Sequence, residues 1–126
     1  MLRKVTLLVS MLTISACQGS GIQSTPEGVI QKIVDSAKTR ELSQLSTLCA
    51  PQAETTANII CEMSEAQPEQ QQAFIHRFLA AKIRGNTEIT GYTAVVTVAS
   101  QPNLERTLSF ELIQENGHWY LQRFLE

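Results

Sequence analysis

Three cysteines carry the most reactive side chains of this 126-residue chain, and two of them lie close together in the sequence. Cys49 and Cys61 could form a disulfide, remain as two buried thiols, bind a metal or act as a nucleophile. Neither has a second Cys or a His within the two to four residues that zinc ligands require. His76 and His118 show no local motif that links them to a cysteine nucleophile. The sequence therefore favours a disulfide, with two free thiols as the alternative.

A disulfide needs an oxidising compartment, and the first residues have the pattern of an export signal. Arg3 and Lys4 precede an uncharged, mostly apolar stretch over residues 5–14, and two small residues follow it. The stretch is far shorter than the roughly 20 residues that a membrane-spanning helix needs. We therefore predict a secretory signal peptide over residues 1–16. After export, a disulfide that closes a loop of about 13 residues would stabilise the fold by about 3 kcal/mol.

The end of this signal, Ile14-Ser15-Ala16-Cys17, resembles the lipobox of bacterial lipoproteins. In that family the cysteine thiol receives a diacylglyceryl group, the signal is cut before the cysteine, and the new amine is usually acylated as well. The resemblance implies that two or three acyl chains at Cys17 anchor the domain. Several acyl chains hold a protein on the membrane far more firmly than one chain does. Gln18, a residue other than Asp, further implies an outer-membrane location facing the periplasm if the source is Gram-negative.

Composition and charge narrow the classes of function. The chain is 43% hydrophobic and 17% charged, which is typical of one small globular domain. Its formal net charge is -2, so it lacks the basic excess of a nucleic-acid-binding protein. No metal box or phosphate-binding loop appears in the sequence. We therefore expect no nucleic-acid partner, no metal and no cofactor.

Apolar periodicity predicts helices in the first half of the exported chain. We expect a lipidated, flexible tether over residues 17–24, followed by the folded domain over residues 25–126. Thr25 can cap a helix that has Pro26 at its first position and an apolar stripe as far as Ala37.

Two further helices are predicted beyond this one. Thr39 can cap a short helix in which leucines recur at every third position over residues 42–48. For residues 52–67 we predict a polar loop, in which a few apolar residues give a weak helical periodicity. A longer helix is expected over residues 69–84, where Gly85 would stop it.

From residue 87 the apolar period changes from 3.6 to 2, which indicates strands. We expect strands over residues 87–90, 93–100 and 104–114. Asn116-Gly117 then predicts a tight hairpin turn to a last strand. In that register Leu112 pairs with Leu121.

The same register assigns side chains to the two faces of the sheet, because paired residues share a face. Phe110 would pair with Arg123, and together with Trp119 they would face the helices. Arg106 would join them by alternation. The two arginines either extend to water or form a clamp for an anionic ligand, with Phe110 and Trp119 as further ligand-binding residues.

The opposite face of this hairpin is unusually apolar. Ile113, Tyr120 and Phe124 would lie there, where a solvated face should be polar. Such a face can meet a partner protein, a helix end or the same strand of a second copy, so a homodimer is one alternative.

Helices followed by antiparallel strands predict an α+β domain with about four strands. Residues 25–29 (TPEGV), 94–98 (AVVTV) and 115–121 (ENGHWYL) resemble small bacterial lipoproteins of the nuclear transport factor 2-like superfamily. The resemblance spans about residues 25–126 and implies a cystatin-like cone, in which a curved sheet wraps the first helix. The cysteine-bracketed segment over residues 49–66 departs from that pattern.

Some members of that superfamily are enzymes with Asp, Tyr and Arg in the cone. Here the one aspartate, Asp35, is placed on the outside of its helix. We therefore expect a non-enzymatic, membrane-anchored envelope lipoprotein that binds an envelope protein or a small apolar or anionic ligand. The alternatives are an enzyme acting in the cone, through Glu88 and Arg123, and a structural subunit that self-associates through the outer sheet face.

Overall fold

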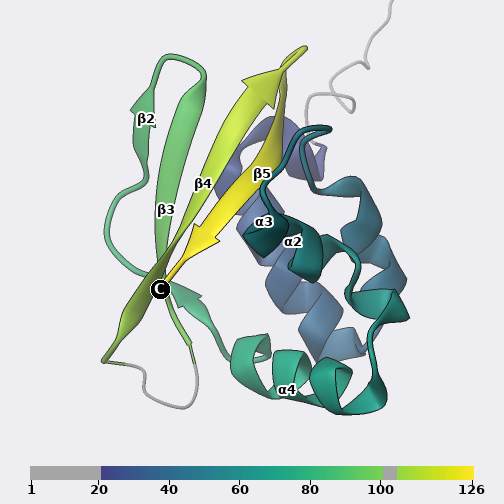
Figure 1. Cartoon of the computed structure of the whole chain (residues 1–126). Coiled ribbons are helices and arrows are strands. Elements are labelled where there is room, and N and C mark those ends of the chain that lie inside the picture. Colours follow the sequence, from purple (N-terminus) through teal and green to yellow (C-terminus); the bar gives the residue numbers. More distant parts are fainter. Residues whose placement is uncertain (1–20, 101–104) are drawn as a thin grey trace, which may run out of the picture.

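The computed structural model describes residues 21–100 and 105–126 as an α+β domain, with helices on one face of an antiparallel sheet (Figure 1). The predicted α+β class is therefore confirmed, and the sheet has five strands where about four were expected. The predicted signal peptide over residues 1–16 and the lipid site at Cys17 lie outside the described residues. Within the described ranges, no helix has the length and hydropathy needed to cross a membrane.

The helices precede the strands in the chain. The helical elements are the 3₁₀ helix η1 (Ile22–Ser24), α2 (Pro26–Thr39), the 3₁₀ helix η2 (Leu42–Thr47), α3 (Thr55–Cys61), the 3₁₀ helix η3 (Met63–Glu65) and α4 (Pro68–Phe78). The strands are β1 (Lys82–Ile83), β2 (Glu88–Thr90), β3 (Thr93–Ala99), β4 (Thr107–Glu115) and β5 (His118–Leu125). They form one sheet in the order β1-β3-β4-β5, and β1 and β2 pair with opposite ends of β3.

The first long helix, α2, begins as the sequence predicted. The Gly28 backbone N–H donates to Thr25 Oγ1 at 3.0 Å, and Pro26 occupies the first turn. Val29 and Ile33 on its apolar stripe are fully buried. The helix contacts β3, β5 and α4, so it forms the centre of the core.

The folded part of the chain begins earlier than predicted. Residues 22–24 form η1, and Gln23 Nε2 donates to the backbone oxygens of Thr47 (3.3 Å) and Trp119 (3.1 Å). The predicted tether over residues 17–24 therefore overlaps the domain, because the long side chain of Gln23 reaches two carbonyls of the fold.

Thr39 does not cap the second helix, contrary to the prediction. It is the last residue of α2, and its hydroxyl donates to the Asp35 carbonyl at 3.0 Å. Glu41, and not Thr39, directly precedes the next helix, and no side chain caps that helix. Arg40 then turns the chain with a φ of 64°, and the predicted leucine helix is the 3₁₀ helix η2.

The predicted helix and loop boundaries between residues 52 and 84 also change. The polar loop over residues 52–67 contains α3 and η3, whose Ile60 and Met63 are buried. The next helix, α4, ends at Phe78 and not near Arg84. Residues 82 and 83 pair with one end of β3 instead, since pairing with an open strand edge outweighs local helix propensity.

The β4–β5 hairpin keeps the predicted register only near its turn. Asn116 and Gly117 have φ values of 54° and 80°, as the predicted type I′ turn requires, and Leu112 pairs with Leu121. The register then shifts by one residue, and Gln122 has no partner on β4. Gln122 is therefore the extra residue of a β-bulge.

The bulge reverses the predicted faces of the last residues. Phe110 pairs with Phe124, not with Arg123, and Arg123 pairs with Glu111. The predictions that Arg123 lies on the apolar face and Phe124 on the outer face are therefore wrong. The physical reason is the period of 2 along a strand, since a shift of one residue exchanges the two faces.

The face of the sheet toward the helices supplies the other half of the core. Leu108, Phe110, Leu112, Trp119 and Leu121 are all buried there, as predicted. On the opposite face Ile113 pairs with Tyr120, and both are half-buried.

Candidate functional site

The four residues predicted to bind a ligand do not form one site. Phe110 and Trp119 are buried in the core, and Arg106 is exposed in the segment before β4. Arg123 lies on the outer face between two carboxylates, Glu54 and Glu111. The bulge turns Arg123 away from the two aromatic residues and pairs it with acids, so the structure does not bring the residues of the predicted anion clamp together.

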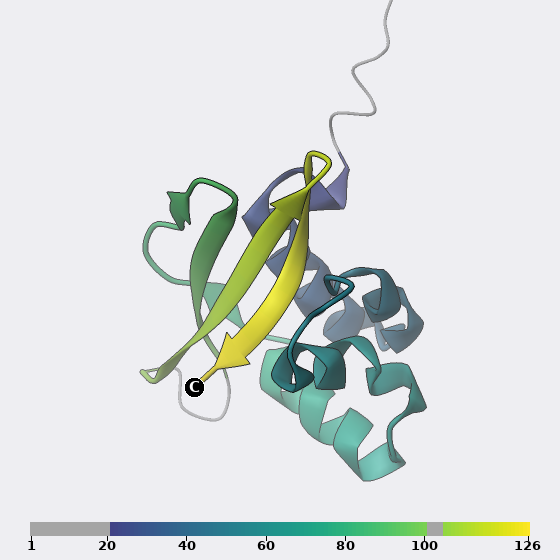
Figure 2. The ribbon, with the colours of Figure 1, turned by 45° about the horizontal axis from the view of Figure 1, so that its top comes forward.

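The edge of β5 is covered by residues 48–56, which we call the strap. Its backbone follows β5 over several residues (Figure 2). The hydrogen bonds run from Leu121 N–H to the Leu48 oxygen (2.7 Å), from Ala50 N–H to the Leu121 oxygen (2.9 Å) and from Glu54 N–H to the Gln122 oxygen (2.9 Å). The strap therefore occupies polar groups of β5 that could otherwise pair with another chain.

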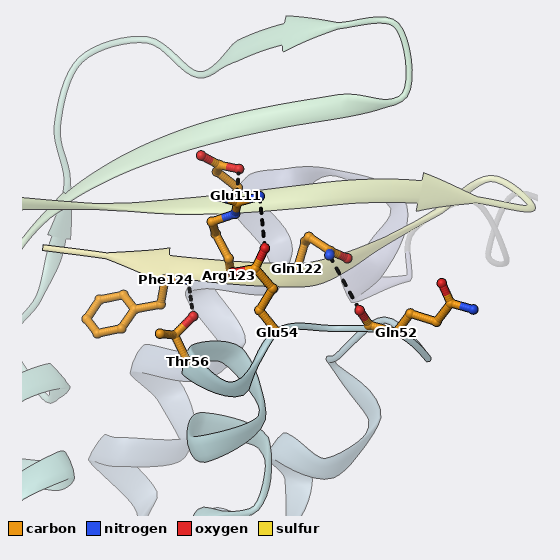
Figure 3. Close-up of polar contacts among 7 residues, drawn as sticks. All are labelled: Gln52, Glu54, Thr56, Glu111, Gln122, Arg123 and Phe124. Atoms are coloured by element: carbon orange, nitrogen blue, oxygen red, sulfur yellow. Dashed lines mark hydrogen bonds and ion pairs between the residues drawn. The ribbon is translucent and has the colours of Figure 1, made fainter.

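Side chains reinforce the strap where it passes the bulge (Figure 3). The contacts are Arg123 Nη2 to Glu54 Oε2 (2.9 Å), Arg123 Nε to Glu111 Oε1 (3.1 Å), Gln122 Nε2 to the Gln52 oxygen (3.5 Å) and Phe124 N–H to Thr56 Oγ1 (3.0 Å). These contacts are structural, since each ties the strap or β4 to β5.

A disulfide joins the strap to α3. Cys49 and Cys61 are bonded, with their Cα atoms 6.2 Å apart, so the predicted pairing is present in the structure. Cys61 is buried in the core and Cys49 is half-buried beside it. The bond thus fixes α3, which forms one wall of the cleft described next.

An open cleft of about 660 Å³ lies between α3, η3, α4 and the end of β5. We call it the α3–α4 cleft. Its lining residues are Thr56, Ile59, Ile60, Glu62, Met63, Glu65, Ala66, Gln70, Ala73, Phe74, Arg77, Phe78 and Phe124. Most of them are apolar, and the Ile59 side chain is 58% exposed. An exposed isoleucine in an apolar cleft is a feature of binding surfaces.

Phe74, Phe78 and Phe124 form the aromatic inner wall of the α3–α4 cleft, and the buried ring of Phe110 packs behind them. The ring centroids of Phe74 and Phe78 lie 5.0 Å apart, and those of Phe110 and Phe124 lie 5.1 Å apart. Phe78 connects the two pairs, at 6.1 Å from Phe110 and 6.3 Å from Phe124. Phe124 belongs to this wall only because of the bulge.

Charged residues frame the cleft unevenly. Arg77 Nη2 forms an ion pair with Glu126 Oε2 at 2.7 Å, and its guanidinium carbon lies 5.6 Å from the Phe78 ring centre and 5.3 Å from that of Phe124. Arg77 is therefore already held by a carboxylate and two rings. The acids Glu62 and Glu65 are exposed, and they give the α3–η3 side a negative rim.

The residues of the alternative enzymatic hypothesis are also separated in space. Glu88 pairs with Val95, Val95 with Glu111, and Glu111 with Arg123, so these four form a row across the outer face. Glu88 and Arg123 are thus three strands apart, about 14 Å at the usual strand spacing. Among residues 21–100 and 105–126, no group of three His, Cys, Asp or Glu side chains could hold a metal.

Sequence reasoning missed the α3–α4 cleft. Two local signals point toward it, which are the apolar residues at 59, 60 and 63 and the aromatic spacing of Phe74 and Phe78. Each signal alone is typical of side chains buried in the core. Only the packing of α3 beside α4 and the bulge at Gln122 brings them together with Phe124.

Comparisons with known proteins give little beyond the fold. No family model matches the chain, and no curated protein matches it. The solution structure of a SEC-C motif containing protein from Rhodopseudomonas palustris is similar, with a TM-score of 0.56 and 11% sequence identity. The similarity covers 86% of this chain and 83% of that chain. At this identity the likeness concerns the fold alone.

Proposed function

We propose that this protein is a lipid-anchored lipoprotein of the cell envelope that binds another envelope protein through the α3–α4 cleft and catalyses no reaction. The observation that carries the binding role is the apolar cleft beside α3 and α4. The lipobox-like residues 14–17 and the export pattern before them support the anchor. We also propose that the domain is nuclear transport factor 2-like, which the packing of helices on one face of an antiparallel sheet supports.

The lining of the α3–α4 cleft supports a binding role because apolar surface open to water is unfavourable unless it is covered. Ile59 and Ala73 are exposed on opposite walls, and Met63 and Phe74 lie between them. Covering such a surface gains about 25 cal/mol for each Å² of apolar area removed from water. A partner that inserts an aliphatic or aromatic side chain would gain this free energy.

The openness of the same walls favours a protein partner over a small molecule. Small ligands are usually buried over most of their surface in an enclosed pocket. An apolar groove with a charged rim is instead typical of sites that take one face of a helix. The negative rim formed by Glu62 and Glu65 suits a helix that carries Lys or Arg beside its apolar anchors.

Site-specific photo-crosslinking in intact envelopes tests this function. A benzophenone side chain at Ala73, in the cleft, should give a discrete protein adduct. The same side chain at Gln31, exposed on α2 away from the cleft, should not. The adduct should disappear when Ile59→Asp places a charge on the facing wall, while Lys38→Asp on α2 should leave it unchanged.

The outcomes separate the possible occupants. An adduct that is cleft-dependent and has the mass of a protein supports the proposal. An adduct with the mass of a lipid or metabolite would instead assign a small ligand and overturn the protein-binding role. Equal crosslinking from residues 73 and 31 would show that the cleft has no specific partner.

A further inference from the structure

We infer that one end of the domain rests on the membrane surface and inserts Ile22, Ile89 and Tyr92 among the lipid headgroups. We call these three residues the anchor face. The inference rests on the proposed lipid anchor at Cys17, and it adds an orientation, in which the anchor face meets the lipid and the α3–α4 cleft faces away from it.

The elements that carry the anchor face meet at one end of the sheet. The Gln114 backbone N–H donates to the Tyr92 oxygen at 2.8 Å, so the β2–β3 turn touches the start of the β4–β5 turn. Gln114 pairs with Trp119, whose oxygen accepts from Gln23 Nε2 at 3.1 Å. This chain of contacts joins both turns to η1 (Figure 2).

The side chains at this end are apolar and open to water. Among the described residues, three of the six exposed large apolar side chains lie here: Ile22 is 46% exposed, Ile89 56% and Tyr92 74%. Exposed tyrosines and branched aliphatic side chains are the residue types that enter the headgroup region of a bilayer. Because these three side chains lie at the same end of the domain, they differ from the single apolar residues that are scattered over most protein surfaces.

The position of Cys17 in the sequence brings this end to the bilayer. The described chain begins at Gly21, beside the anchor face, and only three residues, 18–20, lie between it and Cys17. The four residue-to-residue steps from Cys17 to Gly21 span at most about 14 Å. A lipid on the Cys17 thiol would therefore hold η1 and the adjoining turns within that distance of the membrane.

Charge favours a neutral lipid surface over an anionic one. The exposed charged residues that border the two turns are Glu88 and Glu115, with His118 beside the second turn. Two carboxylates would repel anionic headgroups. Contact must therefore come from apolar insertion together with the anchor.

The opposite end of the molecule holds the partner-binding elements. In Figure 1, α4 lies at the far end of the molecule from η1 and the β4–β5 turn. With the anchor face on the lipid, α4 and its side of the α3–α4 cleft point into the compartment, where an envelope protein could reach them.

Depth-dependent quenching tests the orientation on the lipidated full chain, reconstituted in phosphatidylcholine vesicles that contain bromine-labelled lipids. Tyr92→Trp places a reporter on the anchor face. Leu79→Trp, at a 39% exposed leucine at the end of α4, is the matched control. The parent chain supplies the background from the buried Trp119. We expect several-fold stronger quenching at residue 92 than at residue 79.

A second comparison tests the apolar contribution. Ile22→Ser combined with Ile89→Ser should weaken quenching at residue 92, and adding anionic lipid should not strengthen it. Equal quenching at residues 92 and 79, or no effect of the two serines, would overturn the inference. Vesicle flotation separates the two proposals: a chain that does not float refutes the anchor itself, whereas a floating chain with equal quenching refutes only the orientation.

Discussion

Gln122 has no partner on β4, and this single unpaired residue decides where the last residues of the chain point. Its backbone oxygen accepts a hydrogen bond from the Glu54 N–H of the strap, at 2.9 Å. The extra residue also turns Phe124 toward the aromatic wall of the α3–α4 cleft and Arg123 toward Glu111. A β-bulge thus serves here to aim side chains that an uninterrupted strand would place on the wrong faces.

Deleting Gln122 should destabilise the domain. The deletion would make the register continuous, with Arg123 still opposite Glu111 and Phe124 still opposite Phe110, so both side chains would keep their faces. Because the hydrogen bond from the Glu54 N–H to the Gln122 oxygen would be lost, we expect the free energy of unfolding to fall by about 1 kcal/mol. Denaturant unfolding measures this. Gln122→Ala keeps the bulge and should stay within about 0.5 kcal/mol of the parent. A loss of about 3 kcal/mol or more in the deletion variant would contradict this register, because it would mean that Phe124 and Arg123 had exchanged faces.

Arg123 should contribute only modestly to stability. Its ion pairs with Glu54 and Glu111 are partly solvated, and such pairs are each worth about 0–1 kcal/mol. We expect Arg123→Gln to lower the free energy of unfolding by about 1 kcal/mol at low salt, and by less at high salt. Arg106→Gln, at an exposed arginine before β4, is the control and should have no effect. A large, salt-independent loss at Arg123 would contradict this assignment.

The elements that could be predicted from the sequence are those whose signals are local. The cap at Thr25, the stripe of α2 and the Asn116-Gly117 turn each depend on residues within a few positions of one another, and all three are present. The end of α4 and the position of Arg123 depend on pairing with distant strands. No local pattern records that pairing, so those two predictions failed.

The disulfide should stabilise the strap more than the sheet. It closes the segment from Cys49 to Cys61, and a loop of this length predicts about 3 kcal/mol from the entropy of the unfolded chain. We expect Cys49→Ala with Cys61→Ala to lower the free energy of unfolding by about that amount. Amide hydrogen exchange should then show faster exchange at Ala50 and Glu54, with β3–β4 amides still the slowest. Uniform loss of protection would instead indicate that the bond holds the whole fold.

At the scale of the whole molecule, the two ends of the domain carry surfaces with different proposed roles. One end gathers η1, two turns and the apolar anchor face, and the other holds α4 and its side of the α3–α4 cleft (Figure 1). The sequence alone could suggest an anchor, because the lipobox-like motif is local. It could not suggest the cleft, since Phe124 lies far along the chain from α3 and α4.

The central claim is that the exported chain begins at a lipidated Cys17, and intact-mass analysis of the protein purified from membranes tests it most directly. We predict a product that lacks residues 1–16 and carries a diacylglyceryl group and a further acyl chain on Cys17. Cys17→Ser should abolish both the lipid mass and membrane association, while Cys49→Ala with Cys61→Ala should retain them. A native product that keeps Met1 and carries no lipid would contradict the account.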